Sequence, residues 1–142
     1  MTIAAILSGK GHDIVTVTAG DSVRDAVALL ADRRIGAVPV LDGGEVAGVF
    51  SERDVIYCLK EGDPSVLDRP VREVMTAPAV TVSPQDAVMG ALSLMTRRRI
   101  RHLPVIEQGR MVGIVSIGDL VKYRIDRVEA DAAAMRDYIQ QA

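Results

Sequence analysis

The chain repeats itself: shifted by 65 residues, a segment of its first half aligns with a segment of its second half without a gap. Residues 13–54 lie over residues 78–119, and about sixteen of the forty-two aligned pairs are identical. Such a repeat indicates two copies of one structural unit. Because a unit of under about fifty residues is too small to bury both faces of a sheet alone, we expect the two copies to pack on one another.

Both copies contain the same order of predicted elements. A short β-branched run is followed by a polar turn, a helix with apolar residues at helical spacing, two strands joined by a Gly-containing turn, and a last helix. That last helix begins at Ser51 or Ser116, and in the second copy Ser83-Pro84 predicts the N-cap and first position of the middle helix. The fold class is therefore α/β (α+β): two β-α-β-β-α repeats packed as a pseudo-two-fold pair with two equivalent clefts.

The repeat also sets the expected domain organisation. The first domain covers residues 8–60, a polar linker 61–72, the second domain 73–124 and a C-terminal helical extension 125–142. Apolar residues in the last helix alternate in steps of four and three, as in a coiled-coil seam: Val121, Ile125, Val128, Ala132, Met135 and Ile139. The seam predicts a homodimer, and the alternative is a helix folded back on its own chain.

Composition excludes several classes of protein. A net charge of −2 and an aromatic content of 3% argue against a nucleic-acid partner, and the run Arg97-Arg98-Arg99 is interpreted as the cationic end of a helix. No apolar run is long enough for a membrane span, and the N-terminal residues do not have the pattern of a signal peptide. One Cys and two His exclude a disulfide and a Cys-rich zinc site, which favours a reducing, cytoplasmic environment.

Two short patterns occur once in each copy. The first is an apolar residue followed by Pro-Val, in Val38-Pro39-Val40 and Leu103-Pro104-Val105. The second is G-h-h-S-x-x-D, where h is apolar, in residues 48–54 and 113–119. With these patterns the chain resembles the CBS-domain (cystathionine-β-synthase-type domain) family over residues 13–124, and the pair resembles a tandem CBS, or Bateman-type, module of the small stand-alone bacterial kind. That resemblance implies binding of an adenine nucleotide.

The residues offer a physical rationale for such a ligand. Ser51 and Ser116 stand where a strand leads into a helix, so that free N–H groups and the helix dipole favour a phosphate. Asp54 and Asp119, one turn further on, can accept hydrogen bonds from the two hydroxyls of a ribose. The same Ser-x-x-Asp pattern is also typical of a capping box, in which the two side chains only close the helix start.

The resemblance further implies that the Asp of one copy faces the strand residues of the other. The first predicted site combines Ser51, Glu52, Arg53 and Asp54 with Thr81, Val82, Arg101, His102 and Leu103. The second combines Ser116, Ile117, Gly118 and Asp119 with Thr16, Val17, Gly36, Ala37, Val38 and Pro39. The first site is the more cationic and is the better candidate for phosphate or pyrophosphate, whereas in the second Lys10, Arg34 or Lys122 would have to supply a cation.

These observations predict a sensor rather than an enzyme. The chain has no nucleophile–base arrangement, no HExxH motif and no glycine-rich phosphate loop. We expect the module to bind AMP, with ATP or NAD(H) as other candidates, to require no metal, and to signal through its conformation or the packing of a dimer. The alternative is an interaction or dimerisation scaffold that binds no nucleotide.

Overall fold

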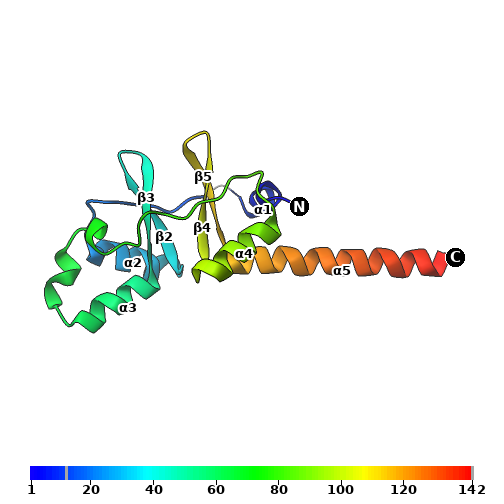
Figure 1. Ribbon diagram of the computed structural model, residues 1–142. Helices are drawn as coiled ribbons and strands as arrows, with labels where there is room; N and C mark the ends of the chain where they lie inside the picture. The colour runs from blue at the N-terminus through cyan, green and yellow to red at the C-terminus, as the bar shows by residue number, and fades with distance from the viewer. Residues whose placement is uncertain (12, 142) are drawn as a thin grey trace.

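Two β-hairpins with the same register form the centre of the two halves (Figure 1). In the first, β2 (Ala37–Asp42) pairs with β3 (Glu45–Ser51), and in the second β4 (His102–Glu107) pairs with β5 (Arg110–Ser116). Both hairpins have a register shift at the corresponding place, after Val40 and after Val105. The computed structural model, which describes residues 1–11 and 13–141, thus confirms the repeat; His12 and Ala142, in the expected first domain and C-terminal extension, lie outside the described residues.

Helices flank the hairpins in the predicted order, so the α/β class with two repeats and a C-terminal helix is confirmed. The helices and 3-10 turns are α1 (Ile3–Lys10), α2 (Val23–Arg33), α3 (Glu52–Glu61), η1 (Pro64–Asp68), η2 (Val71–Glu73), α4 (Val88–Arg98) and α5 (Ile117–Gln141). The segment predicted as a polar linker therefore contains η1, and α1 was not predicted.

The first strand differs between the two repeats. In the first repeat β1 (Val17–Thr18) pairs in parallel with β2, which makes a three-stranded sheet. In the second repeat the predicted strand is reduced to a single bridge between Val82 and Val105 beside a two-stranded sheet. The second copy of the predicted order thus lacks a regular first strand among the described residues.

The expected helix start at Ser83-Pro84 is wrong. The Asp86 carboxylate accepts a hydrogen bond from the Ser83 amide at 2.8 Å, which closes a turn, and α4 begins only at Val88 with Ala87 as its N-cap. In the first repeat the hydroxyl of Ser22 does cap α2, since it accepts from the amide of Asp25 at 3.1 Å. The same turn occurs at the equivalent place in the first repeat, where Asp21 accepts from the amide of Thr18 at 2.9 Å, so in both repeats the helix begins only after a turn with its own acceptor.

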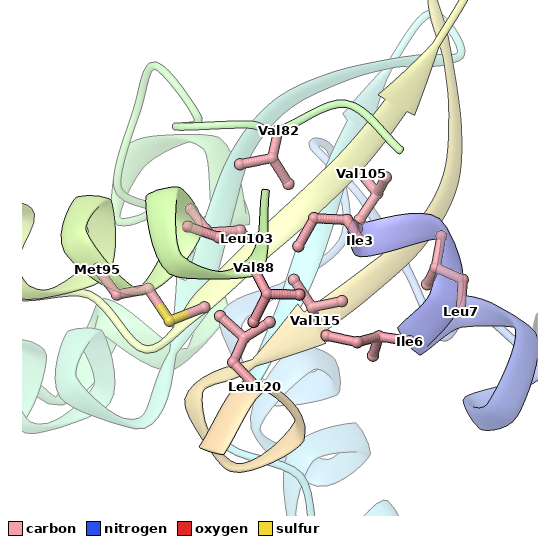
Figure 2. Close-up of a cluster of buried hydrophobic side chains, with 11 residues drawn as sticks. Ile3, Ile6, Leu7, Val82, Val88, Met95, Leu103, Val105, Val115 and Leu120 are labelled. Carbon is pink, nitrogen blue, oxygen red and sulfur yellow. The ribbon is translucent and has the colours of Figure 1, made fainter. Parts of the chain in front are cut away.

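Two hydrophobic clusters form the core, and each takes residues from a segment that precedes the other repeat. Ile3, Ile6 and Leu7 of α1 pack into the cluster of the second repeat (Figure 2), around Leu103 and Val115. In the same way, the segment from Val71 to Met75, which precedes the second repeat, packs into the cluster of the first repeat. The repeats are therefore interlocked by these two segments.

Helix α5 is continuous from Ile117 to Gln141, so the expected boundary at residue 125 lies within one helix. Its first turns pack on the second repeat through the buried Leu120 and the partly buried Tyr123, and the rest extends away from the body (Figure 1). The predicted seam is exposed along this extension, at Val121, Ile125, Val128, Met135 and Ile139. No helix among the described residues combines the length and apolar character that a membrane crossing requires.

Candidate functional site

A cavity of about 330 Å³ lies between the two repeats. From the first repeat it is lined by Gly36, Ala37, Val49, Ser51, Glu52, Arg53, Asp54 and Tyr57. The connecting segment contributes Thr76, Pro78, Ala79 and Val80. The second repeat contributes Arg98, Arg99, Ile100, Arg101 and His102. Because both repeats and their connection form its walls, a ligand in this cavity would contact both halves at once.

Asp54 lies in the wall of the cavity and caps α3. Its Oδ2 accepts from the amide and the hydroxyl of Ser51, at 2.9 and 3.1 Å, and the Ser51 hydroxyl accepts from the Asp54 amide at 3.3 Å, so the capping box is confirmed. Its Oδ1 accepts from the hydroxyl of Thr76 at 3.0 Å. Since an ionised carboxylate has about four acceptor positions, three accepted bonds leave room for a ligand hydroxyl.

The cavity is rich in arginine. Four arginines line it, Arg53, Arg98, Arg99 and Arg101, against two carboxylates, Glu52 and Asp54. None of these arginines forms an ion pair with a described carboxylate. The guanidinium of Arg53 instead donates to the carbonyl oxygen of Arg99 at 2.7 Å and so joins α3 to the turn that ends α4. The excess of fixed cations favours an anionic ligand.

His102 lies on the wall of this cavity and is half-buried. Burial lowers the pKa of its imidazole below the ordinary value, and the charges of Lys10 and Arg101 add to that effect, while Asp119 and Glu52 oppose it. His102 and Glu52 also approach Gly36 closely, because a Cβ at Gly36 would stand 2.6 Å from Glu52 Oε1 and 3.3 Å from His102 Cε1. Because Gly36 has no side chain, there is room for the Glu52 carboxylate and the His102 imidazole beside it.

The corresponding carboxylate of the second repeat has a different partner. Asp119 repeats the capping hydrogen bonds, accepting from the Ser116 amide at 2.8 Å while its own amide donates to the Ser116 hydroxyl at 3.1 Å. Its Oδ2, however, also accepts from Lys10 Nζ at 2.6 Å. Burial alone would raise the pKa of Asp119, but the hydrogen bonds from Lys10 and Ser116 and the charge of Lys10 hold it below its ordinary value.

The structure brings together part of the predicted first site. Of the residues predicted to surround Asp54, it places Ser51, Glu52, Arg53, Arg101 and His102 on the cavity wall. Thr81, Val82 and Leu103 are not on that wall, since Thr81 is exposed and the other two belong to the core of the second repeat.

The residues of the predicted second site do not lie together in the structure. Gly36 and Ala37, which were assigned to Asp119, lie in the Asp54 cavity instead. Val17 and Val38 are core residues of the first repeat, and Pro39 is buried. Thr16, Ser116, Ile117 and Gly118 do not line the cavity either, and neither does Asp119.

Several wall residues were not singled out from the sequence. Tyr57 follows Asp54 by three positions, so helical spacing alone could have placed it beside the carboxylate. Arg98 and Arg99 were interpreted only as a helix end, which they are, with Arg99 at φ 54° as the C-cap. Nothing local marks Thr76 or residues 78–80, because they reach the cavity through the tertiary path of the connecting segment. Among the described residues no group of three or more His, Cys, Asp or Glu side chains could hold a metal ion.

Two interlocked β-hairpin repeats around a shared, arginine-lined cavity define the architecture of a paired-repeat module. The family model described as "CBS domain" matches residues 11–61 and 71–126, and the chain belongs to the CBS-domain family. The mitochondrial CBS domain-containing protein CBSX3 of Arabidopsis thaliana is 34% identical over an alignment of 148 residues, gaps included, which covers 98% of this chain and 72% of that protein.

Solved structures agree with this assignment. A protein with CBS domains from Burkholderia ambifaria is 42% identical, with a TM-score of 0.82, and the match covers 89% of this chain and 95% of that one. The CBS-domain pair of protein MJ0100, solved with 5′-methylthioadenosine and S-adenosyl-L-methionine, is 22% identical with a TM-score of 0.76 and covers 87% of this chain and 98% of its own. The latter likeness shows the shared fold.

Proposed function

We propose that the chain is a non-catalytic regulatory module that binds an anionic adenine nucleotide, AMP first among them, in the cavity between its repeats. The observation that carries the proposal is the set of four arginines around Asp54 in one inter-repeat cavity. A volume of about 330 Å³ is at the lower end of the range for small-molecule sites. This size favours a mononucleotide over a dinucleotide such as NAD(H).

Each part of a nucleotide has a counterpart on the wall. The remaining acceptor position of Asp54 suits a ribose hydroxyl, while Arg53 and Arg101 suit the phosphate. Apolar side chains from both halves, Val49, Val80 and Ile100, can contact the base. The adenosine ligands of protein MJ0100 support the nucleoside part of the proposal, whereas the arginines of this chain favour a phosphate over the cationic sulfonium of S-adenosyl-L-methionine.

Signalling follows from the position of the cavity. A ligand that contacts α3, the connecting segment and the start of β4 favours one arrangement of the two halves over others. The exposed seam of α5 supports our further expectation of a homodimer. Arg124 and Glu129 flank the seam five residues apart with opposite charges, which places them across from each other in a parallel pair. The same exposed seam is the observation that favours a scaffold without nucleotide as the second candidate function.

Titration calorimetry tests the proposal on nucleotide-free protein. We expect AMP to give saturable heat at micromolar to sub-millimolar concentrations, with ATP and NAD(H) compared in parallel and S-adenosyl-L-methionine as the ligand of opposite charge. Absence of heat from every nucleotide at millimolar concentration, in protein shown to be folded by circular dichroism, would remove the sensor and leave the scaffold. Chemical turnover of any of these nucleotides would contradict the non-catalytic assignment. The proposed setting is the cytoplasm, although CBSX3 is a mitochondrial relative.

The affinity for AMP is expected to depend on pH through His102. Burial and the nearby cations Lys10 and Arg101 lower the pKa of this imidazole, against Asp119 and Glu52, so it is neutral near pH 7 in the free protein. A bound phosphate favours the imidazolium and raises that pKa, so binding takes up a proton. The contribution of His102 to the affinity for AMP should therefore increase by about two- to five-fold as the pH falls through the pKa that the imidazole has in the complex. Below the pKa that the imidazole has in the free protein, this contribution should level off.

The control for this dependence is His102→Gln. The second ionisation of a phosphate ester, with a pKa near about 6, acts on both proteins alike, so the difference between the two pH profiles isolates the imidazole. If calorimetry at pH 5.5 to 8 gives superimposable profiles, His102 does not sense the phosphate.

A further inference from the structure

The two capping carboxylates of the repeats are held by partners of different charge. Asp54 accepts its additional hydrogen bond from a neutral hydroxyl, that of Thr76, at 3.0 Å. Asp119 accepts its additional bond from the ammonium of Lys10, at 2.6 Å, on Oδ2, the oxygen that also accepts from the Ser116 amide. Lys10 also donates to the carbonyl oxygen of Ile114 in β5 at 2.8 Å, so its Nζ is bound to the second repeat at two points.

Helix α1, which carries Lys10, is docked on the second repeat. Ile3, Ile6 and Leu7 are buried in the core of the second repeat (Figure 2). The amide of Ile3 donates to the carbonyl oxygen of Asp86 at 2.9 Å. A Cβ on Gly113 would lie 2.6 Å from Leu7 Cδ2, which shows how closely α1 lies on β5. Lys10, the last residue of α1, therefore reaches Asp119 from a docked helix.

The contact engages the two charged groups that a nucleotide would use at the second repeat, the Lys10 ammonium and Asp119 Oδ2. A ribose hydroxyl requires a carboxylate that can accept, and a phosphate requires a free cation. Lys10 and Asp119 instead neutralise each other's charge, within a partly exposed ion pair whose side chains keep 36% and 26% of their accessible surface. The Asp54 cavity shows the opposite arrangement, with a neutral partner for the carboxylate and arginines that form no ion pair with a described carboxylate.

We propose that Lys10 acts as a built-in occupant of the Asp119 position, so that the chain binds one nucleotide, in the Asp54 cavity, and gains a second site only when Lys10 is released. This inference rests on the proposed function. It assigns the two repeats unequal roles: the first-repeat carboxylate takes part in binding, and the second-repeat carboxylate holds α1. A second nucleotide would compete with the Lys10 contact and so couple its binding to the position of the N-terminal helix.

Equilibrium dialysis with radiolabelled AMP tests the proposal by counting nucleotides per chain. We expect one AMP per wild-type chain and two per Lys10→Met chain, with the affinity of the first event unchanged within about two-fold. Methionine keeps the apolar stem of the side chain and removes only the ammonium. Lys60→Met, which neutralises an exposed lysine in the last turn of α3, is the matched control and should bind one AMP.

The outcomes separate the two proposals. Two AMP per wild-type chain, or one AMP per chain in both the wild type and Lys10→Met, overturns the role of Lys10 and leaves the nucleotide module intact. No AMP on any of the proteins overturns the nucleotide module and, with it, this inference. One AMP on Lys10→Met and none on the wild type supports the role of Lys10 and overturns the assignment of the Asp54 cavity.

A second measurement does not depend on nucleotide. Acetylation of amines by an N-hydroxysuccinimide ester, followed by peptide mass spectrometry, should modify Lys10 at least about five-fold more slowly than Lys60 in the wild type. Asp119→Asn removes the charge that holds the ammonium and should bring the two rates together. Equal rates in the wild type would show that the ion pair does not hold Lys10 in solution, which overturns the proposal.

Discussion

Asp54→Ala is expected to weaken AMP binding by about 10- to 100-fold, because a hydrogen bond to a charged group contributes about 1.5–3 kcal/mol. The carboxylate lies in the cavity wall, and three accepted hydrogen bonds orient it. Alanine removes the acceptor for the ribose without changing the arginines that face the phosphate. Titration calorimetry of the variant at 15–25 °C measures the loss directly.

The variant also loses a helix cap, so the control must lose one too. Removing a capping side chain costs about 1 kcal/mol of stability, and Asp119→Ala removes the equivalent cap from α5. We expect Asp119→Ala to keep the wild-type affinity at the Asp54 cavity. If Asp119→Ala loses the tighter binding event and Asp54→Ala keeps it, the assignment of the cavity as the nucleotide site is wrong.

Gly48→Ala is expected to destabilise the fold by about 2–3 kcal/mol, near the upper end of the usual cost of overpacking. A Cβ at Gly48 would lie 2.6 Å from the backbone oxygen of Thr76 and 2.8 Å from the sulfur of Met75. The Thr76 backbone cannot move freely, since it exchanges two hydrogen bonds with Val49, at 3.0 and 2.9 Å. Moving it would also displace the hydroxyl that donates to Asp54. Urea unfolding followed by circular dichroism measures the free energy.

Gly113→Ala is the matched control, because Gly113 is the residue equivalent to Gly48 in the second repeat. There the new Cβ would meet the Cδ2 of Leu7, again at 2.6 Å, but this atom is the end of a side chain that can rotate. We expect a cost below about 1.5 kcal/mol, since a change of rotamer is cheaper than a shift of backbone. Equal costs at the two glycines would contradict the argument that the backbone of Thr76 is the obstacle.

The repeat predicted the hairpins and their surrounding helices well, because those elements depend on local patterns that occur twice. The pairing of Ala37 with Ser51 and of His102 with Ser116 follows from the turn length and the apolar alternation. The repeat did not predict elements whose position depends on long-range contacts. Helix α1 packs on β5 and α5, and that surface lies about a hundred residues further along the chain.

The site was predictable only where a side chain belongs to a repeated motif. Asp54 and Arg53 follow a repeated Ser at a helix start, and the resemblance implied Arg101 and His102 as their neighbours; all four line one cavity in the structure. Gly36 was assigned to the other site, because a sequence does not show that the strands of both repeats begin beside the same cavity. Lys10 at Asp119 could be named only as one of three candidate cations, since its reach depends on the docking of α1.

The docking of α1 on β5 also determines the order in which the protein can be completed during synthesis. Lys10 leaves the ribosome 104 residues before the carbonyl group of Ile114 to which it will donate. At translation rates of about 5–20 residues per second this interval lasts roughly 5–20 seconds. Ile3, Ile6 and Leu7 pack around Leu103 and Val115, so this part of the core is completed only after the second hairpin has emerged.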